Sequence, residues 1–68
     1  MNIHNTTIDQ LLKFIDLKTS VWVWIGIDDL TFEGYAYELF EPKYNKLITN
    51  NIKEMHYQYN TLSIRLED

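Results

Sequence analysis

The sequence lacks cysteine, contains one proline and two glycines, and holds no apolar run near the roughly 20 residues that a membrane-spanning helix needs. Without cysteine there is no disulfide, no thiol nucleophile and no thiolate metal site. Residues 1–5 also lack the basic and apolar stretches of a secretory signal. The sequence therefore predicts a chain without a membrane span that works in a reduced, cytoplasmic compartment.

Basic residues are scarce as well. Six Lys and Arg residues stand against ten Asp and Glu residues, so the net charge is −4. Proteins that bind nucleic acid directly usually carry the opposite charge, because phosphate contacts supply most of the non-specific affinity. Direct binding of nucleic acid is therefore not expected.

The length of 68 residues predicts a single domain over residues 1–68. So short a chain buries only about 60% of the surface that its unfolded form exposes. A hydrophobic content of 46% is a dense supply for its core. Small domains without disulfides often gain stability by self-association or by docking on a partner, which leaves a homodimer open.

A short amphipathic helix is predicted near the N-terminus. Thr7 followed by Gln10 is a capping-box pattern that is typical of a helix start. The apolar residues that follow have the spacing of one helix face: Ile8, Leu11, Leu12 and Ile15, with Phe14 widening the stripe. The pattern predicts a helix over residues 8–15, followed by a polar turn.

Two strands joined by a tight turn are predicted next. Residues 21–27 are β-branched and aromatic, and their alternation places Val21, Val23, Ile25 and Ile27 on one side and Trp22 and Trp24 on the other. Asp28 and Asp29 form the turn, and residues 30–39 form a second strand. Gly34 interrupts this strand, which commonly marks a bulge, a sharp bend or a close backbone approach.

The C-terminal half is predicted to hold a weak strand at residues 47–49 and a hairpin of strands 52–57 and 62–66. Pro42 lies in a loop, Asn50 and Asn51 turn the chain, and residues 59–61 make the hairpin turn. These elements predict an α+β domain: an N-terminal helix packed on a strongly bent antiparallel sheet of four to five strands, partly rolled into a small SH3-like or Sm-like barrel.

The sequence contains no set of residues with the spacing of a catalytic or metal-binding motif. The histidines, His4 and His56, have no second ligand at i+2 or i+4, and zinc requires three or four ligands. Ser20 and Ser63 lack the context of a nucleophile elbow, and no glycine-rich loop opens a helix. We therefore expect a protein that is not an enzyme and that uses no cofactor or metal.

Aromatic and acidic residues concentrate in the first two strands and the segment after them, and these are the candidate partner-binding residues. They are Trp22, Trp24, Asp28, Asp29, Glu33, Tyr35, Tyr37, Glu38 and Glu41, with no Lys or Arg between Asp28 and Glu41. Two interpretations stay open for the aromatic residues: a part of the core beneath the helix, or an exposed binding surface. The acids either solvate a hairpin face or attract a basic partner.

The framework of the sequence resembles short uncharacterised proteins encoded by phages and prophages of low-GC Gram-positive bacteria. The resemblance rests on Thr7, Leu11-Leu12, Ile15-Asp16, Val21-x-Val23, Phe32-Glu33-Gly34-x-Ala36 and Leu62-x-Ile64-x-Leu66. It implies a binding module of anti-CRISPR-like type, which blocks a host protein with a basic surface, such as a nucleic-acid enzyme of a defence system. A structural or assembly component is an alternative with a similar surface.

A second resemblance is to Sm-like RNA-binding proteins. It rests on a helix before Val21-x-Val23, the central Gly34, Phe40-Glu41-x-x-x-Asn45 and Ile64-Arg65. Glu41 stands where that family carries aspartate, and Leu66 stands where it carries glycine. The resemblance implies a small barrel and, as an alternative function, an oligomeric RNA-binding protein.

Overall fold

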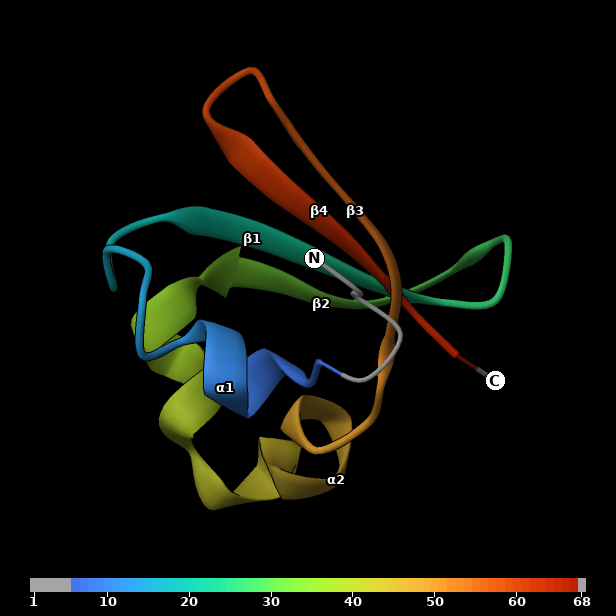
Figure 1. The fold of residues 1–68 in the computed structure, drawn as a ribbon, viewed down its shortest axis with the longest axis horizontal. Coiled ribbons are helices and arrows are strands. Elements are labelled where there is room, and N and C mark those ends of the chain that lie inside the picture. Colours follow the sequence, from blue (N-terminus) through green and yellow to red (C-terminus); the bar gives the residue numbers. More distant parts are fainter. Residues whose placement is uncertain (1–5, 68) are drawn as a thin grey trace.

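The structure is a computed structural model that describes residues 6–67, so His4 lies outside the described residues. Its elements are α1 (Ile8–Leu11), β1 (Ser20–Ile25), β2 (Asp29–Tyr35), the 3₁₀ helices η2 (Ala36–Phe40) and η3 (Pro42–Tyr44), α2 (Asn45–Ile48), β3 (Ile52–Gln58) and β4 (Thr61–Leu66). The helical segments gather on one side of a four-stranded sheet (Figure 1). The predicted α+β class is confirmed.

The sheet has the strand order β2-β1-β4-β3. β1 pairs with β2 and β3 pairs with β4 in antiparallel fashion, whereas the central strands β1 and β4 are parallel. The prediction of an antiparallel sheet is therefore wrong, because the sheet is mixed. The sheet is also not closed, so the predicted partial barrel is not confirmed. The parallel pairing results from the connection over residues 36–51. This connection crosses the sheet and brings β4 to the side of β1 that β2 leaves free.

Each edge strand carries one extra residue in its ladder. Thr31 on β2 has no partner between Phe32 and Leu30, and Lys53 on β3 has none between Ile52 and Glu54. The bulge in β2 thus lies at Thr31 and not at Gly34, where a bulge was one of three meanings that the sequence left open. Bulges of this kind are common on sheet edges, where they twist the strand and discourage unwanted pairing.

The β1–β2 hairpin turns earlier than predicted. β1 ends at Ile25, and Gly26 adopts a φ of 70°, which a residue without a Cβ reaches at little cost. The alternation of the strand stops there, so Ile27 is 82% exposed and its predicted inward orientation is wrong. Asp28 lies in the turn, and Asp29 is already the first residue of β2.

The N-terminal helix starts as predicted but is shorter. The Thr7 N–H donates to Gln10 Oε1 at 3.1 Å, as a capping box requires. The next turn tightens, with the Phe14 N–H bonded to Leu11 O at 2.9 Å, and the regular helix ends at Leu11. Ile8 and Leu12 are buried as expected, but Phe14 is 85% exposed and does not widen the stripe.

Two predicted strand segments are helical instead. The second strand ends at Tyr35, and Ala36 and Leu39, three residues apart, are both buried from the 3₁₀ helix η2. The weak strand predicted at residues 47–49 is α2 and its end, which buries Leu47. Short apolar runs such as these fit a strand or a buried helical turn equally well, so periodicity alone does not distinguish them.

The C-terminal hairpin forms as predicted. β3 and β4 are joined by Tyr59 and Asn60, whose φ values of 55° and 60° are those of a two-residue type I′ turn. Leu62, Ile64 and Leu66 are buried on one face of β4, and the alternate residues lie on the other.

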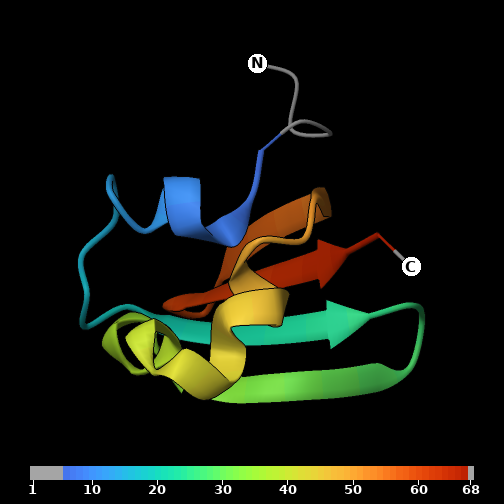
Figure 2. The same cartoon turned by 90° about the horizontal axis from the view of Figure 1, so that it is seen from below.

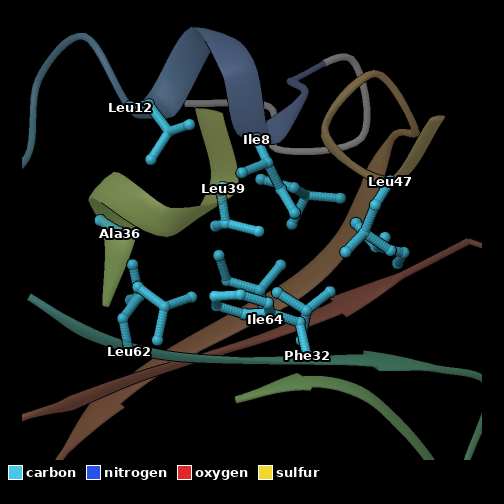
Figure 3. Packing of buried hydrophobic residues seen from close by; sticks show 12 residues of the cluster. Ile8, Leu12, Phe32, Ala36, Leu39, Leu47, Leu62 and Ile64 are labelled. Atoms are coloured by element: carbon cyan, nitrogen blue, oxygen red, sulfur yellow. The ribbon is translucent and has the colours of Figure 1, made fainter. Parts of the chain in front are cut away.

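The helical segments lie against one face of the sheet (Figure 2), and one hydrophobic cluster joins the two layers (Figure 3). Its buried members are Ile8, Leu12, Val21, Val23, Phe32, Ala36, Leu39, Leu47, Ile52, Leu62, Ile64 and Leu66. The Leu39 side chain lies in the middle of this cluster, between Ile8 and Ile64 in the view of Figure 3. None of the polar or charged residues among positions 6–67 is buried, so the core is purely apolar.

We expect Leu39→Ala to destabilise the chain by about 2–5 kcal/mol, because it removes methyl groups from the centre of a close-packed cluster. The neighbouring Phe40→Ala removes a larger side chain that is 56% exposed, so we expect a loss below about 1 kcal/mol. Urea unfolding followed by circular dichroism measures both. An equal loss for the two variants would contradict the packing of η2.

Candidate functional site

One face of the sheet packs against the helical segments, and none of the helices or strands within residues 6–67 covers the other (Figure 1). We call the uncovered surface the open face, defined by the side chains that alternate with the buried ones along the four strands. They are Ser20, Trp22, Trp24, Leu30, Glu33, Tyr35, Glu54, His56, Gln58, Thr61, Ser63 and Arg65. The side chains of the open face are therefore not part of the hydrophobic core.

The two tryptophans lie in the middle of the open face, on the central strand β1. Their ring centroids are 6.4 Å apart with the planes tilted by 54°. Trp22 is 37% exposed, Trp24 is half-buried, and Leu30, opposite Trp24 in the ladder, is 38% exposed. The tryptophans therefore do not belong to the core beneath the helix, which lies on the other face of the sheet.

A shallow groove of about 430 Å³ runs beside the tryptophans toward the β3–β4 hairpin turn. Its lining consists of Trp22, Trp24, His56, Gln58, Tyr59, Thr61 and Ser63. The two indoles supply apolar surface, and the hydroxyl, amide and imidazole groups supply hydrogen-bonding positions. The sequence predicted only the tryptophans here, because the parallel pairing of β1 with β4 leaves no local sequence signal.

The two candidate tyrosines form a pair at the end of β2. Tyr35 and Tyr37 stack with centroids 5.8 Å apart and planes 11° from parallel, and each is about half exposed. Tyr35 belongs to the open face, two residues along β2 from Glu33, whereas Tyr37 belongs to η2. Lys18 lines a small hollow with both rings. The tyrosine pair thus extends the aromatic surface to the border of the helical layer.

Three of the predicted acids lie along β2 and its turn. Glu33 is the cross-strand partner of Trp22, Asp29 is the partner of Ile25, and Asp28 lies in the turn beyond. All three are exposed. Glu33 therefore places negative charge beside Trp22 on the open face, whereas the register puts Asp29 on the face that carries Ile25.

The other two predicted acids have partners within the chain. Glu38 accepts a hydrogen bond from the Tyr35 N–H at 2.7 Å, which caps the start of η2. Glu41 pairs with Lys43 at 3.5 Å, and the Tyr44 phenol, followed by the Glu41 carboxylate, raises the pKa of Lys43 by favouring its charged form. The structure therefore separates Glu38 and Glu41 from Glu33, the acid beside Trp22.

Gly34 explains how Glu38 reaches the backbone. A Cβ at position 34 would lie 2.5 Å from Glu38 Oε2 and 3.1 Å from Phe32 Cζ. The glycine thus marks a close approach, one of the three meanings that the sequence left open, and the group that approaches is a carboxylate.

Three open-face residues combine the side-chain types of a nucleophilic triad. Ser63 is the cross-strand partner of His56, and His56 Nε2 lies 4.0 Å from Glu54 Oε2. However, no hydrogen bond joins Ser63 to His56 in the described part of the chain, and Glu54 is hydrogen-bonded to Arg65. The geometry does not assemble a nucleophile with its base.

Within residues 6–67, no three His, Asp or Glu side chains gather closely enough to hold a metal ion. The helices of the same segment include none with the length and apolar composition that crossing a bilayer requires. Compared with known protein families, curated proteins and solved structures, the chain matches none of them.

We predict that replacing both tryptophans with threonine leaves the fold intact, at a cost of about 1–2 kcal/mol, because both side chains lie on the open face and threonine suits a strand. The matched control is Val21→Thr with Val23→Thr, which places the same residue on the buried face of the same strand. We expect this control to abolish cooperative thermal unfolding, because it buries two hydroxyls in an apolar cluster. Unfolding of the tryptophan variant itself would contradict the assignment of the two faces.

We predict that Gly34→Ala destabilises the chain by about 1 kcal/mol, because the new Cβ displaces the carboxylate that caps Tyr35. Glu38→Ala removes the same hydrogen bond and should cost a similar amount. The two losses should therefore not add in the double variant, as measured by chemical denaturation. Additive losses would show that Gly34 and Glu38 act independently.

Proposed function

We propose that the chain is a non-enzymatic protein-binding module that docks on a partner protein through the open face. The proposal depends mainly on one observation: an exposed tryptophan, Trp22, and a half-buried one, Trp24, lie at the centre of a sheet face that none of the described elements covers. Tryptophan is among the residues most enriched at the energetic centres of protein interfaces. A ring of polar side chains surrounds the pair, as in an interface with an apolar centre and a polar rim.

Large apolar side chains of the open face remain accessible to solvent. Trp22, Tyr35 and Leu30 each have more than a third of their surface exposed. Monomeric proteins rarely expose large contiguous apolar patches unless these bind something. The exposed apolar side chains therefore support a docking surface.

The charge of the chain supports a partner with a basic surface. The net charge is −4, Glu33 lies beside Trp22 on the open face, and Asp28 lies in the turn between β1 and β2. These carboxylates repel nucleic acid and attract Lys and Arg side chains. Together with the resemblance to phage proteins, they support a host protein as the partner, such as a nucleic-acid enzyme of a defence system whose basic groove the module blocks in the host cytoplasm.

The test begins with capture of a protein from a bacterial host lysate at low salt and its identification by mass spectrometry. The captured protein is then purified, and its affinity is measured by calorimetry for the wild type, for Trp22→Thr with Trp24→Thr, and for the control Phe14→Ala. We expect the double variant to bind at least about tenfold more weakly, as for an energetic centre. The control alters an exposed aromatic residue on another surface and should bind like the wild type.

Salt dependence provides a second measurement on the same pair. Electrostatic attraction predicts an association rate that falls steeply between about 0.05 and 0.3 M salt, with little change in the dissociation rate. Equal affinity of the double tryptophan variant and the wild type would contradict the proposed surface. Failure to capture any protein at low salt would count against the proposed function as a whole.

A further inference from the structure

Trp22 and Glu33 are placed side by side by the register of the β1–β2 hairpin. The Ala36 N–H donates to Thr19 O at 2.9 Å, one step beyond the ladder and in the same register. Because hydrogen-bonded and non-hydrogen-bonded pairs alternate in an antiparallel ladder, Trp22 and Glu33 form a non-hydrogen-bonded pair. Side chains approach most closely in such pairs, with Cβ atoms about 4.5–5.5 Å apart.

Among the described residues, none supplies a counter-charge to the Glu33 carboxylate. No hydrogen bond or ion pair of residues 6–67 involves its side chain. Two of the basic residues have acidic partners elsewhere, Arg65 with Glu54 and Lys43 with Glu41. The open face therefore presents a free carboxylate next to an exposed indole.

This combination selects the group that can occupy the site. An apolar side chain over Trp22 would desolvate Glu33 without a partner for its charge, and a phosphate would be repelled by it. A guanidinium group satisfies both neighbours, because it stacks flat on an aromatic ring and donates two parallel hydrogen bonds to a carboxylate. A lysine ammonium matches less well, because it is a strongly hydrated point charge without a planar face.

We propose that the partner protein inserts an arginine side chain at Trp22 and Glu33, with its guanidinium group stacked on the indole and paired with the carboxylate. The proposal rests on the proposed function, because it names the chemistry by which the open face recognises a basic partner. The groove beside Trp22 then receives the residues that flank this arginine.

The test is an NMR titration of the full ¹⁵N-labelled chain with three probes: N-acetyl-arginine amide, N-acetyl-lysine amide and N-acetyl-citrulline amide. Citrulline has nearly the shape of arginine without its charge. We expect a saturable shift of the Trp22 indole N–H with the arginine probe, a weaker response with the lysine probe and none with the citrulline probe. Equal shifts with arginine and citrulline would overturn the proposal, as would the absence of a saturable shift with arginine.

Two variants of equal charge separate a local pair from general attraction. Glu33→Gln should weaken binding of the arginine probe by roughly 1.4- to fivefold, the range of an exposed ion pair. Asp28→Asn removes the same charge at the turn and should change the affinity much less. Equal weakening by both would overturn the site. The arginine probe could fail to shift the Trp22 indole N–H while binding of the captured protein still depends on Trp22. That result would overturn this inference and leave the proposed function intact.

Discussion

The two central strands place a row of buried aliphatic side chains on one face of the sheet: Val21 and Val23 of β1, and Leu62, Ile64 and Leu66 of β4. The rest of the fold depends on covering that face. A chain of 68 residues has little material for this. The helical segments of three to five residues all lie on the same side, where Ile8, Leu39 and Leu47 reach the central strands. Since these segments cover one face, the opposite face is left to side chains that must tolerate water or bind a partner.

The sequence predicted the parts of this fold that local patterns determine. Alternation identified β1 and the buried and exposed sides of β4, and the capping pattern at Thr7 and Gln10 identified the start of α1. The end of β2 was not predicted because it depends on a side-chain contact. The Glu38 carboxylate accepts a hydrogen bond from the Tyr35 N–H, and it has room to do so because Gly34 lacks a Cβ. The parallel pairing of β1 with β4 was not predicted because contacts between distant segments leave no periodic trace.

The sequence singled out tryptophans and acids as candidates, but it did not reveal how the fold arranges them. The window from Asp28 to Glu41 reads as one acidic and aromatic stretch, but the fold divides it. Glu38 and Glu41 are bound to groups of their own chain, whereas Glu33 is left beside Trp22. The groove residues of β3 and β4 come from a distant part of the sequence, so only the structure adds His56 and Ser63 to the surface.

The proposed function requires that the face carrying Trp22 and Trp24 is open in the free chain. A soluble paramagnetic agent, added to the dilute protein, measures solvent access at every residue by NMR. We predict strong relaxation enhancement at the Trp22 indole N–H and at the Glu33 side chain, and little at the methyl groups of Val23, Leu39 and Ile64. Protection of the Trp22 indole to the same degree as these core methyl groups would show that the face is covered, by a second copy or by another part of the chain, and would contradict the account.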